Sequence, residues 1–190
     1  MTCAGRARLT GMRKLKLAMY VSLDDVVEGP SWTGPFWSDQ LSDLQAEYLY
    51  SSDALVLGRV TYEGFAAAWP SMEESTGDFG RKMNSMPKHV ASRTLTETEW
   101  NATLIEGDVV GAVDRLKEAD GGDLLVYGSG TLVDELTRHR LIDEYRLMVH
   151  PVLVGSGKKL FETIDEPVAL RLEDVKTTDT GVAVLTYTLG

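Results

Sequence analysis

Short apolar runs of strand length alternate with segments of helical period along most of this 190-residue chain. A parallel strand is reached through a crossover that is usually a helix, so this alternation is typical of a parallel sheet covered by helices on both faces. We therefore expect an α/β fold. Its strands are expected at residues 15–21, 54–57, 89–91, 103–105 and 124–127. Its helices are expected around residues 41–50, 109–116 and 131–138.

The pattern changes in the last quarter of the chain. Residues 145–149, 168–172 and 182–188 read as three strands with no helix between them. The mostly parallel sheet is therefore expected to end in antiparallel C-terminal strands. Earlier in the chain, residues 71–87 are rich in polar side chains and are expected to form a loop.

The organisation expected from the sequence is one domain preceded by a short extension. No shift in composition marks a boundary within residues 13–190, so we take this range as a single domain. Residues 1–12 show no periodic pattern and are expected to be a disordered extension, or to lie upstream of a start at Met12.

Charge and composition argue against several classes of function. The formal net charge is −10, whereas a general nucleic-acid binder needs a basic face. No apolar run has the length of a signal peptide or a membrane span. Cys3 is the single cysteine, which fits a reducing cytoplasm, and His89, His139 and His150 lack the spacing of metal ligands. We expect a cytoplasmic protein with a small-molecule substrate and no metal, nucleic-acid or membrane partner.

Two strands are joined to helices through glycine and small polar residues. In DALVLGRVTYEGF, Gly58 ends the strand and opens a helix, and in DLLVYGSGTLVDEL the residues from Gly128 to Thr131 do the same. A helix start offers unpaired N–H donors and the positive end of the helix dipole, and glycine allows close approach of a phosphate. Each junction alone also fits an ordinary turn, but two in one parallel sheet favour a dinucleotide site.

The common dinucleotide and nucleotide motifs do not fit these junctions. The first strand is followed by SLDDVVEG, which has no tight glycine cluster, and GSG is followed by Val133 where a third glycine would stand. No Gly-Lys-Ser/Thr triplet is present, so a P-loop is absent. A different scheme of dinucleotide binding is expected.

The chain resembles the dihydrofolate-reductase superfamily, and within it the C-terminal reductase domain of bacterial riboflavin-biosynthesis deaminase-reductases. The resemblance begins near Lys14 and extends to the end of the chain. Its motifs are SLDDVVEG, LGRVTYEGF and VYGSGTLVDELTRHRLIDEYRLMVHPVLVGSGKKLF. It implies a three-layer dihydrofolate-reductase-like fold and an NADPH-dependent reductase. The deaminase half of those proteins needs a His-x-Glu and a Pro-Cys-x-x-Cys segment, and both are absent from this sequence.

The resemblance also implies which residues contact NADPH. Arg59 and Thr61 would bind the adenosine side, where the planar guanidinium of Arg59 suits the 2'-phosphate. Ser92 and Arg93 match a polar pair near the same phosphate, although Arg93 equally fits a solvated surface residue. The remaining implied contacts are Tyr20 and Val21 near the nicotinamide, and Gly58, Gly128, Ser129, Gly130 and Thr131 at the pyrophosphate with Leu132 behind them.

Two carboxylates are candidates for a catalytic acid. Asp24 follows the Ser-Leu-Asp of the resemblance, although Asp25 replaces the glycine that usually comes next. Asp43 matches the position of an acid on the helix after the first strand in pterin-reducing relatives. It equally fits a residue that faces outward from that helix. Hydride transfer needs little more than alignment of two rings and exclusion of water, so a missing catalytic motif does not argue against a reductase.

Two further pairs of residues have open roles. Lys158 and Lys159 fit a substrate phosphate, or else a solvated hairpin or a dimer contact. Trp32 and Trp37 fit a cover over a substrate ring, or else core packing.

The leading functional hypothesis is NADPH-dependent reduction of a pterin-like or ribosylaminopyrimidine-like heterocycle, as in folate or riboflavin metabolism. The enzyme would then resemble either a dihydrofolate reductase or a 5-amino-6-(5-phosphoribosylamino)uracil reductase. The alternatives are a non-catalytic module that binds NADP(H) or another nucleotide, and a structural or interaction protein. Relatives of this kind commonly form homodimers, and the antiparallel C-terminal strands offer an edge for pairing.

Overall fold

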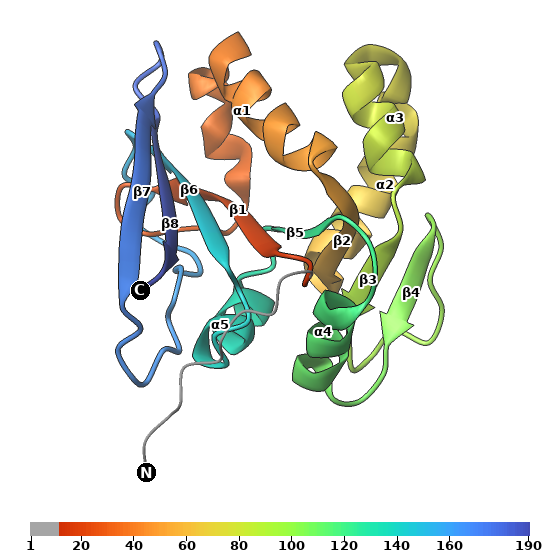
Figure 1. Ribbon diagram of the computed structural model, residues 1–190. Coiled ribbons are helices and arrows are strands. Elements are labelled where there is room, and N and C mark those ends of the chain that lie inside the picture. The colour runs from red at the N-terminus through yellow and green to blue at the C-terminus, as the bar shows by residue number, and fades with distance from the viewer. Residues whose placement is uncertain (1–11) are drawn as a thin grey trace.

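The computed structural model describes residues 12–190, in which one sheet is flanked by two layers of helices (Figure 1). The extension expected at residues 1–12 lies outside this range except for Met12. The strands are β1 (Leu15–Ser22), β2 (Ser52–Gly58), β3 (Lys88–Ala91), β4 (Ala102–Ile105), β5 (Asp123–Tyr127), β6 (Glu144–His150), β7 (Leu170–Thr177) and β8 (Ala183–Leu189). The helices are the 3-10 helix η1 (Pro30–Phe36) and the α-helices α1 (Asp39–Tyr50), α2 (Arg59–Thr76), α3 (Asp78–Ser85), α4 (Val109–Glu118) and α5 (Gly130–Arg138).

The sheet has eight strands in the order β4-β3-β2-β5-β1-β6-β8-β7. β1 lies near the centre and pairs in parallel with both β5 and β6. β8 runs antiparallel to both of its neighbours, β6 and β7. This arrangement confirms the expected α/β fold, which is mostly parallel and has antiparallel pairing at its C-terminal end. Because β1, β5 and β6 are parallel neighbours, their carboxyl ends meet at one edge of the sheet.

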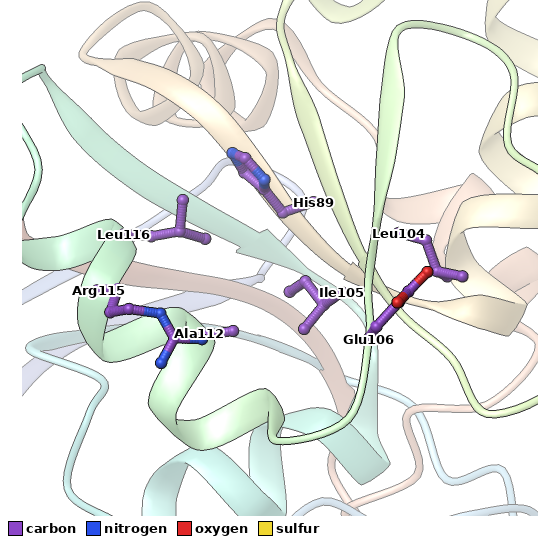
Figure 2. A pocket seen from close by; sticks show the side chains of 7 residues that line it. All are labelled: His89, Leu104, Ile105, Glu106, Ala112, Arg115 and Leu116. Atoms are coloured by element: carbon purple, nitrogen blue, oxygen red, sulfur yellow. The ribbon is translucent and has the colours of Figure 1, made fainter.

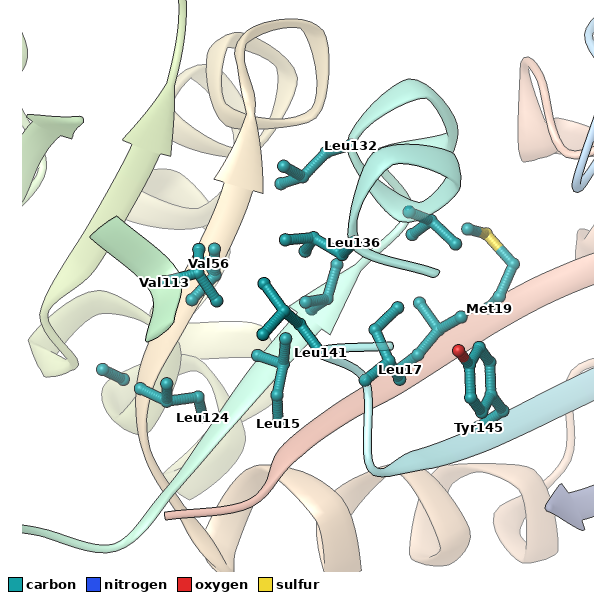
Figure 3. Packing of buried hydrophobic residues seen from close by; sticks show 14 of the residues in the cluster. Leu15, Leu17, Met19, Val56, Val113, Leu124, Leu132, Leu136, Leu141 and Tyr145 are labelled. Carbon is teal, nitrogen blue, oxygen red and sulfur yellow. The ribbon is translucent and has the colours of Figure 1, made fainter. Parts of the chain in front are cut away.

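The alternation of side chains along the strands produces two separate cores. Leu15, Leu17 and Met19 of β1 face α4 and α5, where they pack with residues such as Val113 and Leu136 (Figure 3). The opposite face packs against α1, α2 and α3 through the residues Ala18, Leu41, Leu57, Tyr62, Met83 and Met148. Since strands buried on both faces need apolar residues at successive positions, β1, β2 and β5 contain the continuous apolar runs 17–21, 54–57 and 124–127.

The prediction of a loop at residues 71–87 is wrong, because most of this segment is helical. α2 continues through Pro70 to Thr76, and α3 follows after Gly77, whose φ of 59° allows the sharp turn. Trp69 and Phe79 pack with ring centroids 5.5 Å apart, which anchors both helices to the sheet. The polar composition reflects the exposed faces of the two helices, and the sparse apolar positions were too few to reveal the helical period.

Two other elements also differ from the expected ones. The strand expected at residues 168–172 begins at Leu170 and continues to Thr177. The segment that contains Trp32, for which no helix is expected from the sequence, forms the 3-10 helix η1, which follows Gly29 with a φ of 54°.

Lys88 is a fully buried lysine at the start of β3. Its Nζ donates to the carbonyl oxygen of Asn84 at 2.9 Å and lies 3.9 Å from the centre of the Trp100 ring. Burial lowers the pKa of Lys88 from 10.5 to about 8. The folded state therefore binds fewer protons than the unfolded state between these two pH values.

We expect the free energy of unfolding to rise between pH 8 and pH 10.5 as the burial of a charged Lys88 is relieved. The two pKa values correspond to a penalty of about 3 kcal/mol below pH 8. Lys88→Met should remove this rise, whereas Lys159→Met, at an exposed lysine, should retain it. Urea unfolding at pH 7 to 10 measures the effect. Parallel profiles for the wild-type protein and Lys88→Met would contradict the prediction.

Candidate functional site

The two glycine junctions lie next to each other at the carboxyl ends of β2 and β5, which pair in parallel. The Gly58 N–H donates to Ser129 Oγ at 2.9 Å, and the Ser129 N–H donates to Thr61 Oγ1 at 3.0 Å. Ser129 Oγ also donates to the carbonyl oxygen of Tyr127 at 2.9 Å. The side chain of Ser129 therefore joins the two junctions, and the starts of α2 and α5 form one continuous surface.

The turn after β5 requires an unusual backbone. Gly128 has a φ of 51°, and the following Ser129 has a φ of 61°. A Cβ atom at Gly128 would lie 3.1 Å from Thr61 Oγ1, which is closer than ordinary packing allows. Glycine is therefore needed at position 128 for both its conformation and its close approach to α2.

The N-termini of α2 and α5 are free to bind an anion. Neither helix has a side-chain cap or an acidic residue in its first turn. By contrast, α1 and α4 are capped by the side chains of Ser38 and Asp108, and α3 begins with Asp78. The first N–H groups of a helix have no partner within the helix, and the dipole makes that end positive. The two helices that meet at the junctions are thus the two α-helices, within residues 12–190, that leave this end open.

Lys158 adds a positive charge to the same surface. Its Nζ donates to Thr131 Oγ1 in the first turn of α5, and its Cε lies 3.8 Å from where a Cβ of Gly130 would be. Lys158 reaches this place because its carbonyl oxygen accepts the Val27 N–H at 2.9 Å. Lys159 is exposed. The structure thus places the Lys158 ammonium at the start of α5, and the three roles open for this residue in the sequence stay predictions.

The polar residues expected at the adenosine side lie at the same edge. Arg59 is in the first turn of α2 and forms an ion pair with Glu63 at 2.8 Å. Ser92 and Arg93 follow β3, which pairs in parallel with β2. Ser92 Oγ accepts the N–H groups of Thr94 and Leu95 at 3.1 and 3.0 Å, so it shapes this turn, while Arg93 is exposed.

Asp24 holds two loops together. Its carboxylate accepts hydrogen bonds from Ser22 Oγ at 2.6 Å and from the N–H groups of Val154 and Gly155 at 3.0 and 2.7 Å. These hydrogen bonds, that of Ser22 first, lower the pKa of Asp24 well below its usual range. Asp25 adopts a φ of 70°, the left-handed conformation that a glycine would take at this position. Asp24 thus connects the segment after β1 to the segment after β6. Its catalytic role stays a prediction.

Asp43 lies on the exposed side of α1, and the structure does not bring it next to Tyr20. The α1 residue at that place is Gln45, which is buried and whose Nε2 donates to the Tyr20 hydroxyl. Gln45 was missed from the sequence, although its position four residues after the buried Leu41 marks the same helix face. The catalytic role of Asp43 stays a prediction.

Buried polar atoms gather on the α1 side of β5 and β6. Among residues 12–190, Tyr127 Oη, Arg146 Nε and His150 Nε2 are buried without a hydrogen-bond partner, as is Asp134 Oδ1 on α5. Burial also raises the pKa values of the Tyr20 and Tyr127 hydroxyls. Buried polar groups are normally hydrogen-bonded, so three unpaired atoms on one face indicate a place for a polar ligand or water.

Sequence reasoning gave no role to these strand residues. Arg146 and His150 alternate with apolar neighbours and read as half-buried strand, and their common position depends on the pairing of β6 with β1. Trp32 packs edge-on against His150 with ring centroids 5.3 Å apart, whereas Trp37 is half exposed. Tyr20 and Val21 lie on β1 beside this group, at its carboxyl end.

A separate shallow groove of about 340 Å³ lies between α4 and the neighbouring strands β3 and β4 (Figure 2). It is lined by His89, Leu104, Ile105, Glu106, Ala112, Arg115 and Leu116. Burial, and to a lesser extent the charge of Arg13, lower the pKa of His89. The groove contains none of the residues expected at the cofactor site.

Within residues 12–190 no group of three or more His, Cys, Asp or Glu side chains is placed to hold a metal ion. Across the same residues, none of the helices combines the length and apolar character needed to cross a membrane.

Comparison with known proteins supports the fold and identifies the family. The uncharacterized protein YyaP of Bacillus subtilis (strain 168) is 28% identical over 178 residues, which cover 92% of this chain and 94% of YyaP. A crystal structure from Shewanella sp. PV-4, named for riboflavin biosynthesis, matches with a TM-score of 0.76 and 22% identity over 94% of this chain and 99% of that one. Dihydrofolate reductase from Enterococcus faecalis matches with a TM-score of 0.60 and 16% identity over 95% of this chain and 98% of that one. The model of the RibD C-terminal domain matches residues 13–184, and the chain therefore belongs to the RibD C-terminal domain family.

Proposed function

We propose that this protein is a cytoplasmic NADPH-dependent reductase of a small heterocycle, either pterin-like or ribosylaminopyrimidine-like. The observation that carries the proposal is the meeting of two uncapped helix N-termini, those of α2 and α5, at Gly58 and Gly128. Such paired ends suit a pyrophosphate at the carboxyl edge of a parallel sheet. The Enterococcus faecalis dihydrofolate reductase, which has the same fold, was solved in complex with NADP(H).

The residues present fit the parts of NADPH in order along the sheet edge. Gly128 to Thr131 and Lys158 would hold the pyrophosphate, and Arg59, with Thr61, Ser92 and Arg93 nearby, would hold the adenosine 2'-phosphate. Tyr20 and Val21 would lie beside the nicotinamide. When bound, NADPH supplies a hydride, which reduces a C=N or C=O bond while a proton is added to the heteroatom. The protein aligns the two rings and excludes water.

Titration of the protein with NADPH tests the cofactor, with protein fluorescence as the readout. We expect saturable quenching at micromolar NADPH, and the absence of quenching at tens of micromolar would overturn the proposal. Loss of absorbance at 340 nm in the presence of pterin and pyrimidine substrates then tests turnover.

A non-catalytic NADP(H)-binding module is the second candidate function. The environments of the two expected acids favour it. Asp24 already accepts hydrogen bonds from backbone N–H groups, and Asp43 is exposed. Quenching by NADPH without oxidation by any substrate of the panel would support this candidate over the reductase.

Lys158→Ala is expected to weaken NADPH binding about 3- to 10-fold, because a partly exposed charge near a phosphate contributes about 1 kcal/mol. The loss should shrink as salt is raised. Lys159→Ala is the matched control, since the neighbouring side chain is exposed. Fluorescence titration at low and high salt measures both variants. An equal effect of the two substitutions would show that Lys158 has no specific contact with the cofactor.

We further propose a homodimer formed through β7. This strand is at the edge of the sheet, and its Leu172 and Val175 side chains are each about half exposed. Light scattering should give a mass near twice the 20.9 kDa of the chain. The double substitution of Leu172 and Val175 by Glu should return it to the monomer mass. Met72→Glu, at another exposed apolar residue, is the control, and a monomeric wild-type protein would contradict the proposal.

A further inference from the structure

His150 is the most deeply buried of the unpaired polar groups near the expected nicotinamide. It ends β6, pairs in register with Ser22 of β1, and has no exposed surface. Its ring lies among three aromatic rings in edge-on contact. The centroid distances are 5.4 Å to Tyr20, 5.3 Å to Trp32 and 5.9 Å to Phe36.

The hydrogen bonding of the ring defines its chemistry. His150 Nδ1 lies 2.8 Å from the carbonyl oxygen of Met148, and a carbonyl can only accept, so Nδ1 carries the proton. Burial lowers the pKa of His150 and outweighs the backbone contacts with Met148 and Val21, which raise it, so the ring is neutral near pH 7. Nε2 is therefore a hydrogen-bond acceptor, and it has no donor.

The surrounding aromatic rings do not supply that donor. The indole N–H of Trp32 donates to the carbonyl oxygen of Glu28 at 3.1 Å, Phe36 has no polar atom, and Tyr20 Oη contacts Gln45. An unpaired acceptor in an aromatic environment is costly unless a ligand pairs with it. The register with Ser22 places this acceptor next to Tyr20 and Val21, where the reducible ring would lie.

The charges on the helices beside His150 disfavour a phosphate. α1 carries Asp39, Asp43 and Glu47 but neither lysine nor arginine, and η1 has no charged residue. The nearby cation, Arg146, is buried, donates to the Leu44 carbonyl oxygen at 2.7 Å and pairs with Glu47 at 3.2 Å. These three carboxylates are exposed, so they act on the site through their negative field, which disfavours a phosphate and leaves an uncharged ring unaffected.

We propose that His150 Nε2 accepts a hydrogen bond from a ring N–H of the substrate, and that this substrate is an uncharged heterocycle without a phosphate. The inference rests on the proposed reductase function and names its substrate class. His150 is then a specificity-determining residue that positions the ring, and the ring displaces at least one of the covering side chains of η1. Of the two substrate types considered above, the phosphorylated ribosylaminopyrimidine is disfavoured.

The substrate class is tested on the wild-type protein saturated with NADP⁺, which permits binding without turnover. The probes are 5-amino-6-(5-phosphoribosylamino)uracil, the same compound without its phosphate, and 7,8-dihydropterin. We expect at least one of the two uncharged probes to bind ~10-fold or more tightly than the phosphorylated one. Equal or tighter binding of the phosphorylated probe, or no binding of any probe, would overturn the proposal. The NADPH titration is a separate measurement, so failure of the reductase proposal can be distinguished from failure of the proposed substrate class.

The role of His150 is tested with a matched pair of variants. His150→Gln keeps an acceptor near the position of Nε2, whereas His150→Phe keeps the ring and removes the acceptor. We expect Phe to weaken binding of the uncharged probe ~10-fold or more and Gln to retain it within ~3-fold, with NADPH binding unchanged in both. Unchanged probe binding in the Phe variant would overturn the role. If the Phe variant does not fold, probe binding by the Gln variant decides, and a loss of ~10-fold or more would overturn it.

Discussion

Arg59→Ala is expected to weaken NADPH binding about 10- to 100-fold and to leave NADH binding unchanged. Hydrogen bonds from a guanidinium to a charged group contribute about 1.5–3 kcal/mol, and NADH lacks the 2'-phosphate that Arg59 would bind. Arg59 is at the open start of α2, with 43% of its side chain exposed. Its ion pair with Glu63 must be exchanged for the phosphate, so Glu63→Gln should strengthen NADPH binding slightly.

The control for Arg59 is Arg81→Ala, because Arg81 also forms an exposed ion pair, with Asp78, but lies on α3. Arg93→Ala separates the two roles open for that residue, since a phosphate contact predicts weaker NADPH binding and a solvated surface residue predicts no change. Fluorescence titrations with both cofactors measure all of these variants. If Arg59→Ala weakens NADH as much as NADPH, then Arg59 does not recognise the 2'-phosphate.

Asp143→Ala is expected to lower the free energy of unfolding by about 3–5 kcal/mol, because removal of one partner leaves a buried charge uncompensated. Lys117 Nζ lies 2.8 Å from Asp143 Oδ2, and these side chains are only 7% and 17% exposed. Lys117 also donates to the Leu141 carbonyl oxygen at 2.6 Å, and Asp143 accepts the Leu15 N–H at 2.8 Å. The pair therefore joins α4, the entry to β6 and the start of β1.

Urea unfolding at pH 7 measures this effect, with Glu135→Ala as the control. Glu135 pairs with Arg138 on the surface of α5, and both side chains are more than one third exposed, so the expected change is below about 1 kcal/mol. Replacing Lys117 and Asp143 together by Met and Leu should recover part of the loss, since no unpaired charge remains but the buried Leu15 N–H loses its acceptor. Equal destabilisation by Asp143→Ala and Glu135→Ala would contradict the buried ion pair.

The sheet could be predicted from the sequence because its information is local. Residues 17–21 and 124–127 are apolar at successive positions, which indicates strands buried on both faces, and this is their place in the structure. The helices at residues 71–85 could not be predicted in the same way. Their packing depends on contacts such as that between Trp69 and Phe79, while the intervening residues are polar because they face solvent.

The same distinction between local sequence information and contacts between distant segments applies to the candidate site. The turns at Gly58 and Gly128 were recognisable because their chemistry is contained in a few consecutive residues. Gln45, Tyr127 and His150 were not, because α1, β5 and β6 bring them together from three distant parts of the chain. Asp24 was recognised as important, but its hydrogen bonds to Val154 and Gly155 are made to backbone atoms 130 and 131 residues away.

These hydrogen bonds of Asp24 have a mechanical consequence. Three sets of hydrogen bonds connect the segment after β1 to the segment after β6. The Asp24 carboxylate accepts two backbone N–H groups, the Val27 N–H donates to the Lys158 carbonyl oxygen, and the Leu160 N–H donates to the Asp25 carbonyl oxygen. Lys158 belongs to the segment after β6 and also contacts α5. If Lys158 contacts a cofactor phosphate as proposed, a displacement there would move the segments after β1 and β6 together. This set of hydrogen bonds therefore predicts mechanical coupling between the two ends of the candidate site.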